Sequence, residues 1–315
     1  MFNRNLAISG LIFSFHISCG PNIQFYGCIE GDCDDGTGTW LDGSGSTYKG
    51  EFRNGKRQGR GMLIYPDGDK WEGLWKNDKQ WTGNGIIKSD WYKYFGQYKK
   101  GRRNGKGEFS SYDWPYDANY AGNWKDGKMD GKGTFLFSSG AKYIGEWKDG
   151  DMHGDGVYTY YNGSKFNGEL NFDTLDGKGV YTAINGYEYS GNFKNDYFSG
   201  NGEEKFPDGQ HYNGEFNRNR RHGEGKLYNE LGEKYIGTWN YGKKHGLGKQ
   251  KFQNGNSYIG EWKDGIMHGN GVMLIVNGKK IHGNWNDGLI EKQIPEEKIV
   301  LYLKNKYPRF DEFDY

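Results

Sequence analysis

The most regular feature of this chain is an aromatic side chain followed two residues later by glycine, in a unit that repeats every 23 residues. Nine of the ten intervals are 23 residues, and the interval from Tyr94 to Tyr120 is 26 residues. The first positions of the copies are Tyr48, Trp71, Tyr94, Tyr120, Tyr143, Phe166, Tyr189, Tyr212, Tyr235, Tyr258 and Ile281. A fixed period of this length predicts stacked copies of one small unit. No copy holds a unique reactive group, so we expect function to lie in a surface.

Polar and apolar residues alternate within each copy in the pattern of a β-strand. In the copy that begins at Tyr143, the alternation places Tyr143, Gly145 and Trp147 on one face, and Ile144 and Glu146 on the other. Residues 154–160 are rich in residues that favour strands and predict a second strand. Each copy is therefore expected to form a β-hairpin.

Two positions of the unit predict turns. Asn162-Gly163, like its equivalents in other copies, is typical of a tight type I′ turn, in which both central residues have positive φ. The eighth position holds only Gly, Asp or Asn, which tolerate left-handed backbone, so a positive φ is expected there as well. Its occupants are Gly55, Asp78, Gly101, Gly127, Gly150, Asp173, Asp196, Asn219, Gly242, Gly265 and Gly288.

The glycine two residues after each ring is expected to leave its backbone bare so that the ring of the neighbouring copy can lie over it. The fifth position adds a second apolar series: Phe52, Trp75, Tyr98, Trp124, Trp147, Leu170, Phe193, Phe216, Trp239, Trp262 and Trp285. Equivalent rings two strands apart are ~9.6 Å apart, so side chains of the intervening strand are expected to fill the gap. A single copy cannot offset its ordering entropy with two rings, whereas a stack of copies can.

The composition argues against a disordered chain and against a nucleic-acid-binding protein. The chain has 54 glycines in 315 residues, yet its aromatic content of 17% argues against disorder. Its 42 basic and 41 acidic residues leave no overall basic excess, so no nucleic-acid partner is expected.

The N-terminal segment differs from the repeats. Arg4 precedes a mostly apolar run, Leu6 to Ser18, of about 13 residues, which is too short to span a membrane. Residues 1–19 resemble a bacterial lipoprotein signal, which implies that Cys19 is lipidated and anchors the protein in the cell envelope. A plain secreted protein and a cytoplasmic protein with an uncleaved N-terminus are the alternatives.

Cys28 and Cys33 follow that segment. Export would permit a disulfide between them, whereas a cytoplasmic location would leave two free thiols. Their spacing excludes a CxxC motif.

The repeated unit, YxGEWKDGxxHGxGxxxxxxG, resembles the MORN repeat over residues 48–288, as about ten full copies and a partial one. Residues 27–47 resemble the second half of a repeat and are expected to cap the array at its N-terminal end. The resemblance implies an all-β fold, in which hairpins lie edge to edge in a single elongated, twisted antiparallel sheet.

Two copies depart from the pattern. The copy at 71–93 has an extra residue, and the next copy carries a three-residue insertion near 111–116. We expect an irregular edge there, with exposed rings at Trp81, Trp91 and Trp114.

Residues 289–315 form a tail outside the repeat. Pro295 followed by two acidic residues, and then by an apolar run to Leu303, predicts a short helix that ends before Pro308. A sheet edge needs covering, so this helix is expected to cap the end of the array. A final strand over residues 298–304 is the alternative.

Several motifs are weak candidates for chemistry. Four histidines share one repeat position, but copies are ~9.6 Å apart, which is too far for one metal ion to bridge. We expect them to be solvated turn residues; they are His153, His222, His245 and His268. The GxG sequences have strands on both sides, unlike a phosphate-binding loop. Asp32 to Gly36 lacks the acid that would complete a calcium loop and is expected to form a turn.

Basic runs recur in the same hairpin region. Arg102 and Arg103 in one copy, and Arg220 and Arg221 in another, are expected to line one edge that meets anionic headgroups or an acidic partner. Ordinary charged turns are the alternative.

No catalytic residue set, cofactor site or metal site stands apart from the repeat, so no enzymatic activity is expected. The leading hypothesis is a non-enzymatic scaffold, anchored in the envelope, that binds a protein partner along its sheet surface. The alternative is a module that binds phospholipid headgroups or cell-surface glycans.

The N-terminal hypothesis predicts a specific chemical species. Mass spectrometry of the mature protein should find Cys19 as the first residue, carrying a diacylglyceryl group. An unmodified N-terminus upstream of Cys19 would contradict both the lipid anchor and the envelope location.

Overall fold

The computed structural model describes residues 26–89, 91–111 and 118–313, and it confirms the predicted all-β fold class. The described residues form 24 antiparallel strands of one sheet and a single short α-helix near the C-terminus. The chain divides into two compact units, residues 1–138 and 139–315. Cys19 and Trp114 lie outside the described residues.

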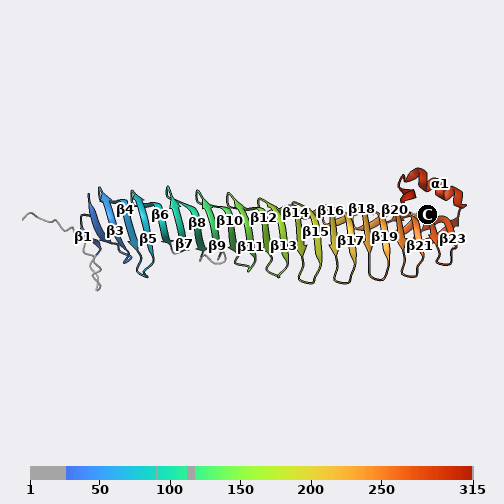
Figure 1. Cartoon of the computed structure of the whole chain (residues 1–315), viewed down its shortest axis with the longest axis horizontal. Helices are drawn as coiled ribbons and strands as arrows, with labels where there is room; N and C mark the ends of the chain where they lie inside the picture. The colour runs from blue at the N-terminus through green and yellow to red at the C-terminus, as the bar shows by residue number, and fades with distance from the viewer. Residues whose placement is uncertain (1–25, 90, 112–117, 314–315) are drawn as a thin grey trace, which may run out of the picture. The chain divides into compact units, whose positions relative to one another are not determined.

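Unit 1 contains ten strands, and each pairs with the next along the chain (Figure 1). They are β1 (Gly27–Gly31), β2 (Thr37–Leu41), β3 (Thr47–Arg53), β4 (Lys56–Ile64), β5 (Lys70–Lys76), β6 (Lys79–Lys88), β7 (Tyr92–Lys99), β8 (Arg102–Ser111), β9 (Asn119–Lys125) and β10 (Lys128–Leu136).

Unit 2 continues the same hairpin pattern and adds the helix α1 (Glu296–Lys306) and the 3-10 helix η1 (Phe310–Phe313). Its strands are β11 (Lys142–Lys148), β12 (Asp151–Thr159), β13 (Lys165–Asn171), β14 (Thr174–Thr182), β15 (Glu188–Lys194), β16 (Tyr197–Lys205), β17 (His211–Asn217), β18 (Arg220–Tyr228), β19 (Lys234–Asn240), β20 (Lys243–Lys251), β21 (Ser257–Lys263), β22 (Ile266–Leu274), β23 (Lys280–Asn286) and β24 (Leu289–Gln293).

The eighth position of the repeat lies in a tight turn, as predicted. All eleven occupants have positive φ, from 64° at Asn219 to 107° at Gly150. In each copy the preceding residue also has positive φ, as at Asp149 with 55°. Two consecutive residues with positive φ are the signature of a type I′ hairpin turn, so the tight turn of each copy lies here.

The prediction of a type I′ turn at Asn162-Gly163 is wrong. Only Gly163 has positive φ there. The amide of Gly163 donates to the carbonyl of Tyr160, and the amide of Tyr160 donates to the carbonyl of Ser164, each at 2.9 Å. This is a longer loop, in which a β-turn is followed by one left-handed glycine.

The first-position ring of each copy lies flat over two glycines. Gly145 and Gly156 face each other across β11 and β12, and the ring of Tyr143 lies over both. A Cβ atom on either glycine would overlap that ring. The covering ring belongs to the same copy, because its side chain leans along its own strand, so the prediction that the neighbouring copy supplies it is wrong.

The tyrosine hydroxyl has a constant partner. Tyr143 donates to the carbonyl of Glu146 at 2.9 Å, and Tyr212 donates to the carbonyl of Glu215 at 3.0 Å. The strand register shifts at this point, since Gly214 pairs with Gly225 while Glu215 pairs with His222. The hydroxyl therefore satisfies a carbonyl group at a β-bulge.

The fifth-position rings fill the gaps between copies. Trp239 packs edge-on against Tyr212 and Tyr235, at centroid distances of 5.3 and 5.2 Å. Trp262 lies in the same way between Tyr235 and Tyr258, at 5.4 Å from each. Side chains of the intervening strand also enter these gaps, as expected. Lys244 of β20 lies 5.0 Å from the rings of both Tyr235 and Trp262, and Phe198 of β16 stacks on Tyr189 at a centroid distance of 3.7 Å.

Each unit therefore has two unlike faces. We call the face formed by the first, third and fifth positions of the copies the ring face. The other face, which carries the second and fourth positions, we call the opposite face. The aromatic first-position side chains on the ring face are almost fully buried, as in Tyr212 and Tyr258, with exposed fractions of 0%. On the opposite face exposure varies, since Ile144 is 47% exposed and Ile259, at the same repeat position, is 0% exposed.

The predicted helix α1 is confirmed, but it packs on the face of β20–β22 and not along the last edge of the sheet. Pro295 caps its N-terminus, Glu296 and Glu297 occupy the first turn, and the helix ends before Pro308. Strand β24 ends the sheet by pairing with β23, so the expectation that the helix caps this edge is wrong, as is the alternative of a strand over residues 298–304. No helix in the described ranges is long and apolar enough to cross a bilayer.

Replacing Tyr212 with phenylalanine tests the role of the hydroxyl. Tyr212→Phe should lower the free energy of unfolding by about 1 kcal/mol, because the carbonyl of Glu215 loses its hydrogen bond in a buried place. Urea denaturation measures the change. Tyr161→Phe removes the same group from an exposed loop residue and should change the free energy by less than about 0.5 kcal/mol. Equal effects of the two substitutions would rule out a structural role for the hydroxyl.

Candidate interaction surface

The predicted surface residues separate into exposed and packed groups. Trp91 is 65% exposed and Arg102 and Arg220 are exposed. Trp81 is only partly exposed, and the ammonium group of Lys76 lies 4.6 Å from its ring centroid.

Arg103 and Arg221 lie on the ring face. The guanidinium of Arg103 lies 4.5 Å from the ring centroid of Phe109 and 5.0 Å from that of Trp124. Arg221 lies 4.7 Å from the ring of Tyr212 and donates to Glu204 at 2.7 Å. Because successive residues of a strand point to opposite faces, each basic pair is divided between the two faces. Both pairs begin a strand directly after a tight turn, in β8 and β18, but only Arg102 and Arg220 are exposed.

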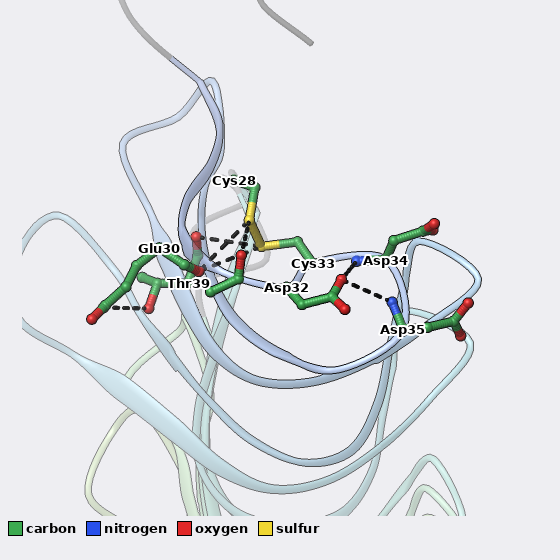
Figure 2. Close-up of a disulfide and its surroundings, with 8 residues drawn as sticks. Cys28, Glu30, Asp32, Cys33, Asp34, Asp35 and Thr39 are labelled. Atoms are coloured by element: carbon green, nitrogen blue, oxygen red, sulfur yellow. Dashed lines mark hydrogen bonds between the residues drawn. A yellow bond between two sulfur atoms is a disulfide. The ribbon is translucent and has the colours of Figure 1, made fainter. Parts of the chain in front are cut away.

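Cys28 and Cys33 are joined by a disulfide between β1 and the loop before β2 (Figure 2). In that loop the carboxylate of Asp32 accepts hydrogen bonds from the amides of Asp34 and Asp35, at 2.9 and 3.1 Å (Figure 2). These two bonds lower the pKa of Asp32. Hydrogen bonds from its own backbone amides to the Asp32 carboxylate therefore hold this acidic loop in a turn.

The histidine position lies in strands rather than in solvated turns. His153, His222, His245 and His268 belong to β12, β18, β20 and β22, and all four are partly buried. The ring of His222 lies 5.2 Å from that of Tyr241 in the next tight turn. Among the residues that the structure describes, no group of three or more potential ligands could hold a metal ion.

In unit 2 the tail of the chain covers part of the opposite face. Ile299 and Leu303 of α1 and Phe310 of η1 form one buried cluster with three residues of the sheet, Leu247, Ile259 and Val272. These three belong to β20, β21 and β22. The sheet therefore binds an amphipathic helix through apolar side chains that point to its opposite face.

Ion pairs and hydrogen bonds surround the apolar cluster. The carboxylate of Glu261 accepts hydrogen bonds from Lys306 at 2.6 Å, from the hydroxyl of Tyr307 at 2.8 Å and from the amide of Asn270 at 2.7 Å. Burial alone would raise the pKa of Glu261, but these three bonds outweigh burial and lower it. Arg309 forms a further ion pair with Glu224 of β18.

A cavity of about 390 Å³ lies beside this contact. Its walls come from the opposite face of β16–β20, including Ile236 and Leu247, and from the segment after α1, including Tyr307 and Phe313. Glu215 and Glu224 add charge to its lining.

In unit 1 the opposite face of β3–β7 forms an open groove of about 760 Å³. Leu74 and Phe95 line it with exposed fractions of 42% and 46%. Lys49, Arg60 and Lys70 stand beside them and are exposed. The groove thus combines exposed apolar side chains with exposed cations.

The sequence predicted exposed rings in the irregular copies, and this surface was not among the predicted sites. The signal was present at the second and fourth positions of the copies. Leu74 and Phe95 are apolar at positions where other copies carry Glu or Asn, such as Glu261 and Asn213.

The fold and this surface define a repeat protein built from β-hairpins. The family model of the MORN repeat matches more than half of the chain, which therefore belongs to the MORN repeat family. The match omits 71–93, the copy with the extra residue. The matched segments are residues 48–70, 94–115, 120–142, 143–165, 166–186, 189–211, 212–229, 235–257 and 258–280.

No curated protein matches the chain. Among solved structures it is similar to the TCP domain of SAS-4 in complex with a proline-rich motif of Ana2 from Drosophila melanogaster, with 12% identity, a TM-score of 0.32, and coverage of 50% of this chain and 86% of that one. It is also similar to a streptogramin B lyase, with 11% identity, a TM-score of 0.14, and coverage of 83% and 87%. For virginiamycin B lyase from Staphylococcus aureus, the identity is 11%, the TM-score is 0.14, and the coverage is 79% and 83%. No conclusion about function follows from such low scores.

Neutralising Glu261 tests how the tail is held. Glu261→Gln should weaken the contact of α1 by about 1 kcal/mol, because the ion pair with Lys306 is lost, and should speed amide exchange in α1 about fivefold. Glu146→Gln, at the same repeat position, is the control. Hydrogen exchange followed by mass spectrometry measures both.

The same contact should depend on pH. The pKa of Glu261 is lowered in the folded protein, so its contribution is fully present above about pH 4.5 and is lost as the pH falls through the lowered value. Exchange in α1 should therefore rise in acid more steeply in the natural protein than in Glu261→Gln. Equal pH profiles would show that this carboxylate does not hold the tail.

Proposed function

We propose that this MORN repeat protein is a non-enzymatic scaffold that binds a protein partner on its opposite face. The observation that carries the proposal is the docking of α1 on β20–β22 in unit 2. The chain's own tail supplies an amphipathic helix, and the sheet offers it Ile259 and Val272, with Glu261 at the margin. A partner can use the same kind of contact wherever the opposite face is open.

Exposed apolar side chains support the same proposal. Phe95, Ile144 and Val180 lie on the opposite face of their strands and are exposed. The ring face does not offer such contacts, because its first-position rings are buried within the array. The opposite face is therefore the better candidate for a protein interface.

The N-terminal segment supports an envelope location for this scaffold. Under this proposal, a lipidated Cys19 would hold the array at a membrane surface and present it to partners in that compartment. The alternative of binding phospholipid headgroups rests on the basic side chains around Lys49 and Arg60, which are exposed. One experiment separates the two.

Site-specific photo-crosslinking tests the proposal. Benzoylphenylalanine placed at Phe95, Ile144 and Val180, one position at a time, should give adducts of protein mass when the protein is irradiated in native membranes. The same residue at Ile184, an exposed loop position, is the control and should give none. Adducts with lipid or glycan alone would favour the alternative, and the absence of any adduct from all three positions would contradict protein binding on this face.

A further inference from the structure

We propose that the groove over β3–β7 binds an amphipathic helix of a partner protein that carries acidic residues beside its apolar side. This inference rests on the proposed function and names the chemistry of the partner. It is carried by the apolar side chains of the groove, by its unpaired cations, and by comparison with the docked tail in unit 2.

The groove contains an apolar strip. Leu74 of β5 and Phe95 of β7 are 42% and 46% exposed, and Met62 of β4 also lines the groove. Exposed apolar side chains gathered in one groove are typical of a surface that is covered by a partner. In unit 2 the equivalent strip, centred on Ile259, is fully buried by the chain's own tail.

The charge around this strip is strongly basic. Residues 47–111 contain 15 Lys and Arg against seven Asp and Glu, a net charge of +8, whereas the whole chain has a net charge of +1. Lys49, Arg60 and Lys70 line the groove with one acid, Glu72. Within the described residues, none of the three cations forms an ion pair, whereas Lys88 and Lys93 pair with Asp69 in the loop before β5.

One repeat position of the groove carries the opposite charge to its equivalent beside the docked tail. Arg60 occupies the position that Glu224 occupies in unit 2, where the acid pairs with Arg309 of the tail. Phe95 occupies the position of Ile259, which packs against the helix. The groove therefore has an apolar side chain where the tail-binding surface of unit 2 has one, and a cation where that surface has an anion. The complementary helix must carry acids where the tail carries bases.

The dimensions suit a helix of this kind. Five neighbouring strands, β3 to β7, span about 19 Å at ~4.8 Å per strand. At 1.5 Å per residue this corresponds to about 13 helical residues, and α1 has 11 residues.

Two synthetic peptides provide the probes. The first has the sequence of residues 294–313 of this chain. The second is identical except for Lys298→Glu, Lys304→Glu, Lys306→Glu and Arg309→Glu, which keep the apolar positions and make the helix acidic. Each carries a fluorescent label, and its binding to the full chain is measured by fluorescence polarisation at low and high salt.

The acidic peptide should bind at least tenfold more tightly than the natural one, and its affinity should fall as salt is raised. Leu74→Glu and Arg60→Glu should each weaken binding at least fivefold. Ile184→Glu, which places the same charge on an exposed loop residue outside the groove, should leave binding unchanged. Circular dichroism establishes that each variant is folded.

Failure of the acidic peptide to bind, equal affinity of both peptides, or equal effects of Leu74→Glu and Ile184→Glu would overturn the inference. Binding of vesicles of phosphatidylglycerol that is weakened by Arg60→Glu but not by Leu74→Glu, without binding of the acidic peptide, would also overturn it. The outcomes separate the two proposals. If protein adducts form at Ile144 or Val180 while the acidic peptide fails to bind, the scaffold function stands and only this inference falls.

Discussion

The fold depends on an aromatic ring that lies flat on two glycines that face each other across a hairpin. Tyr235 covers Gly237 and Gly248 in this way, and a Cβ atom on Gly248 would overlap the ring. Burying such a ring contributes on the order of 2 kcal/mol. Because the ring lies along the sheet, the next fifth-position ring can close the gap, and a single layer of strands buries its own core without a second layer.

This construction assigns different roles to the two faces. The ring face is filled from within, and even cations such as Arg103 and Arg221 lie against its rings. The opposite face is not needed for the core, so its second and fourth positions are free to differ between copies. In unit 2 they bind the tail, with Glu261 holding Lys306, and in unit 1 they leave a basic, partly apolar groove. Function is therefore expected where the repeat varies.

Much of the fold could be predicted from the sequence, because it follows from local constraints. The eighth position must have positive φ, and only Gly, Asp and Asn occupy it. The helix after Pro295 follows from its cap and its charges. The position of that helix could not be predicted, because alternation shows that Ile259 and Val272 share a face but not which distant segment covers them. Alternation likewise shows that Arg102 and Arg103 point to opposite faces, but not that Arg103 packs against the rings of Phe109 and Trp124.

A double-mutant cycle between Tyr235 and Gly248 tests the central claim most directly. Gly248→Ala should lower the free energy of unfolding by about 1–3 kcal/mol in the natural chain, because the added methyl group meets the ring. In a Tyr235→Ala background the same substitution should cost no more than a few tenths of a kcal/mol, since the ring is gone. If Gly248→Ala costs the same in both backgrounds, the ring does not require the bare glycine, and this account of the fold is contradicted.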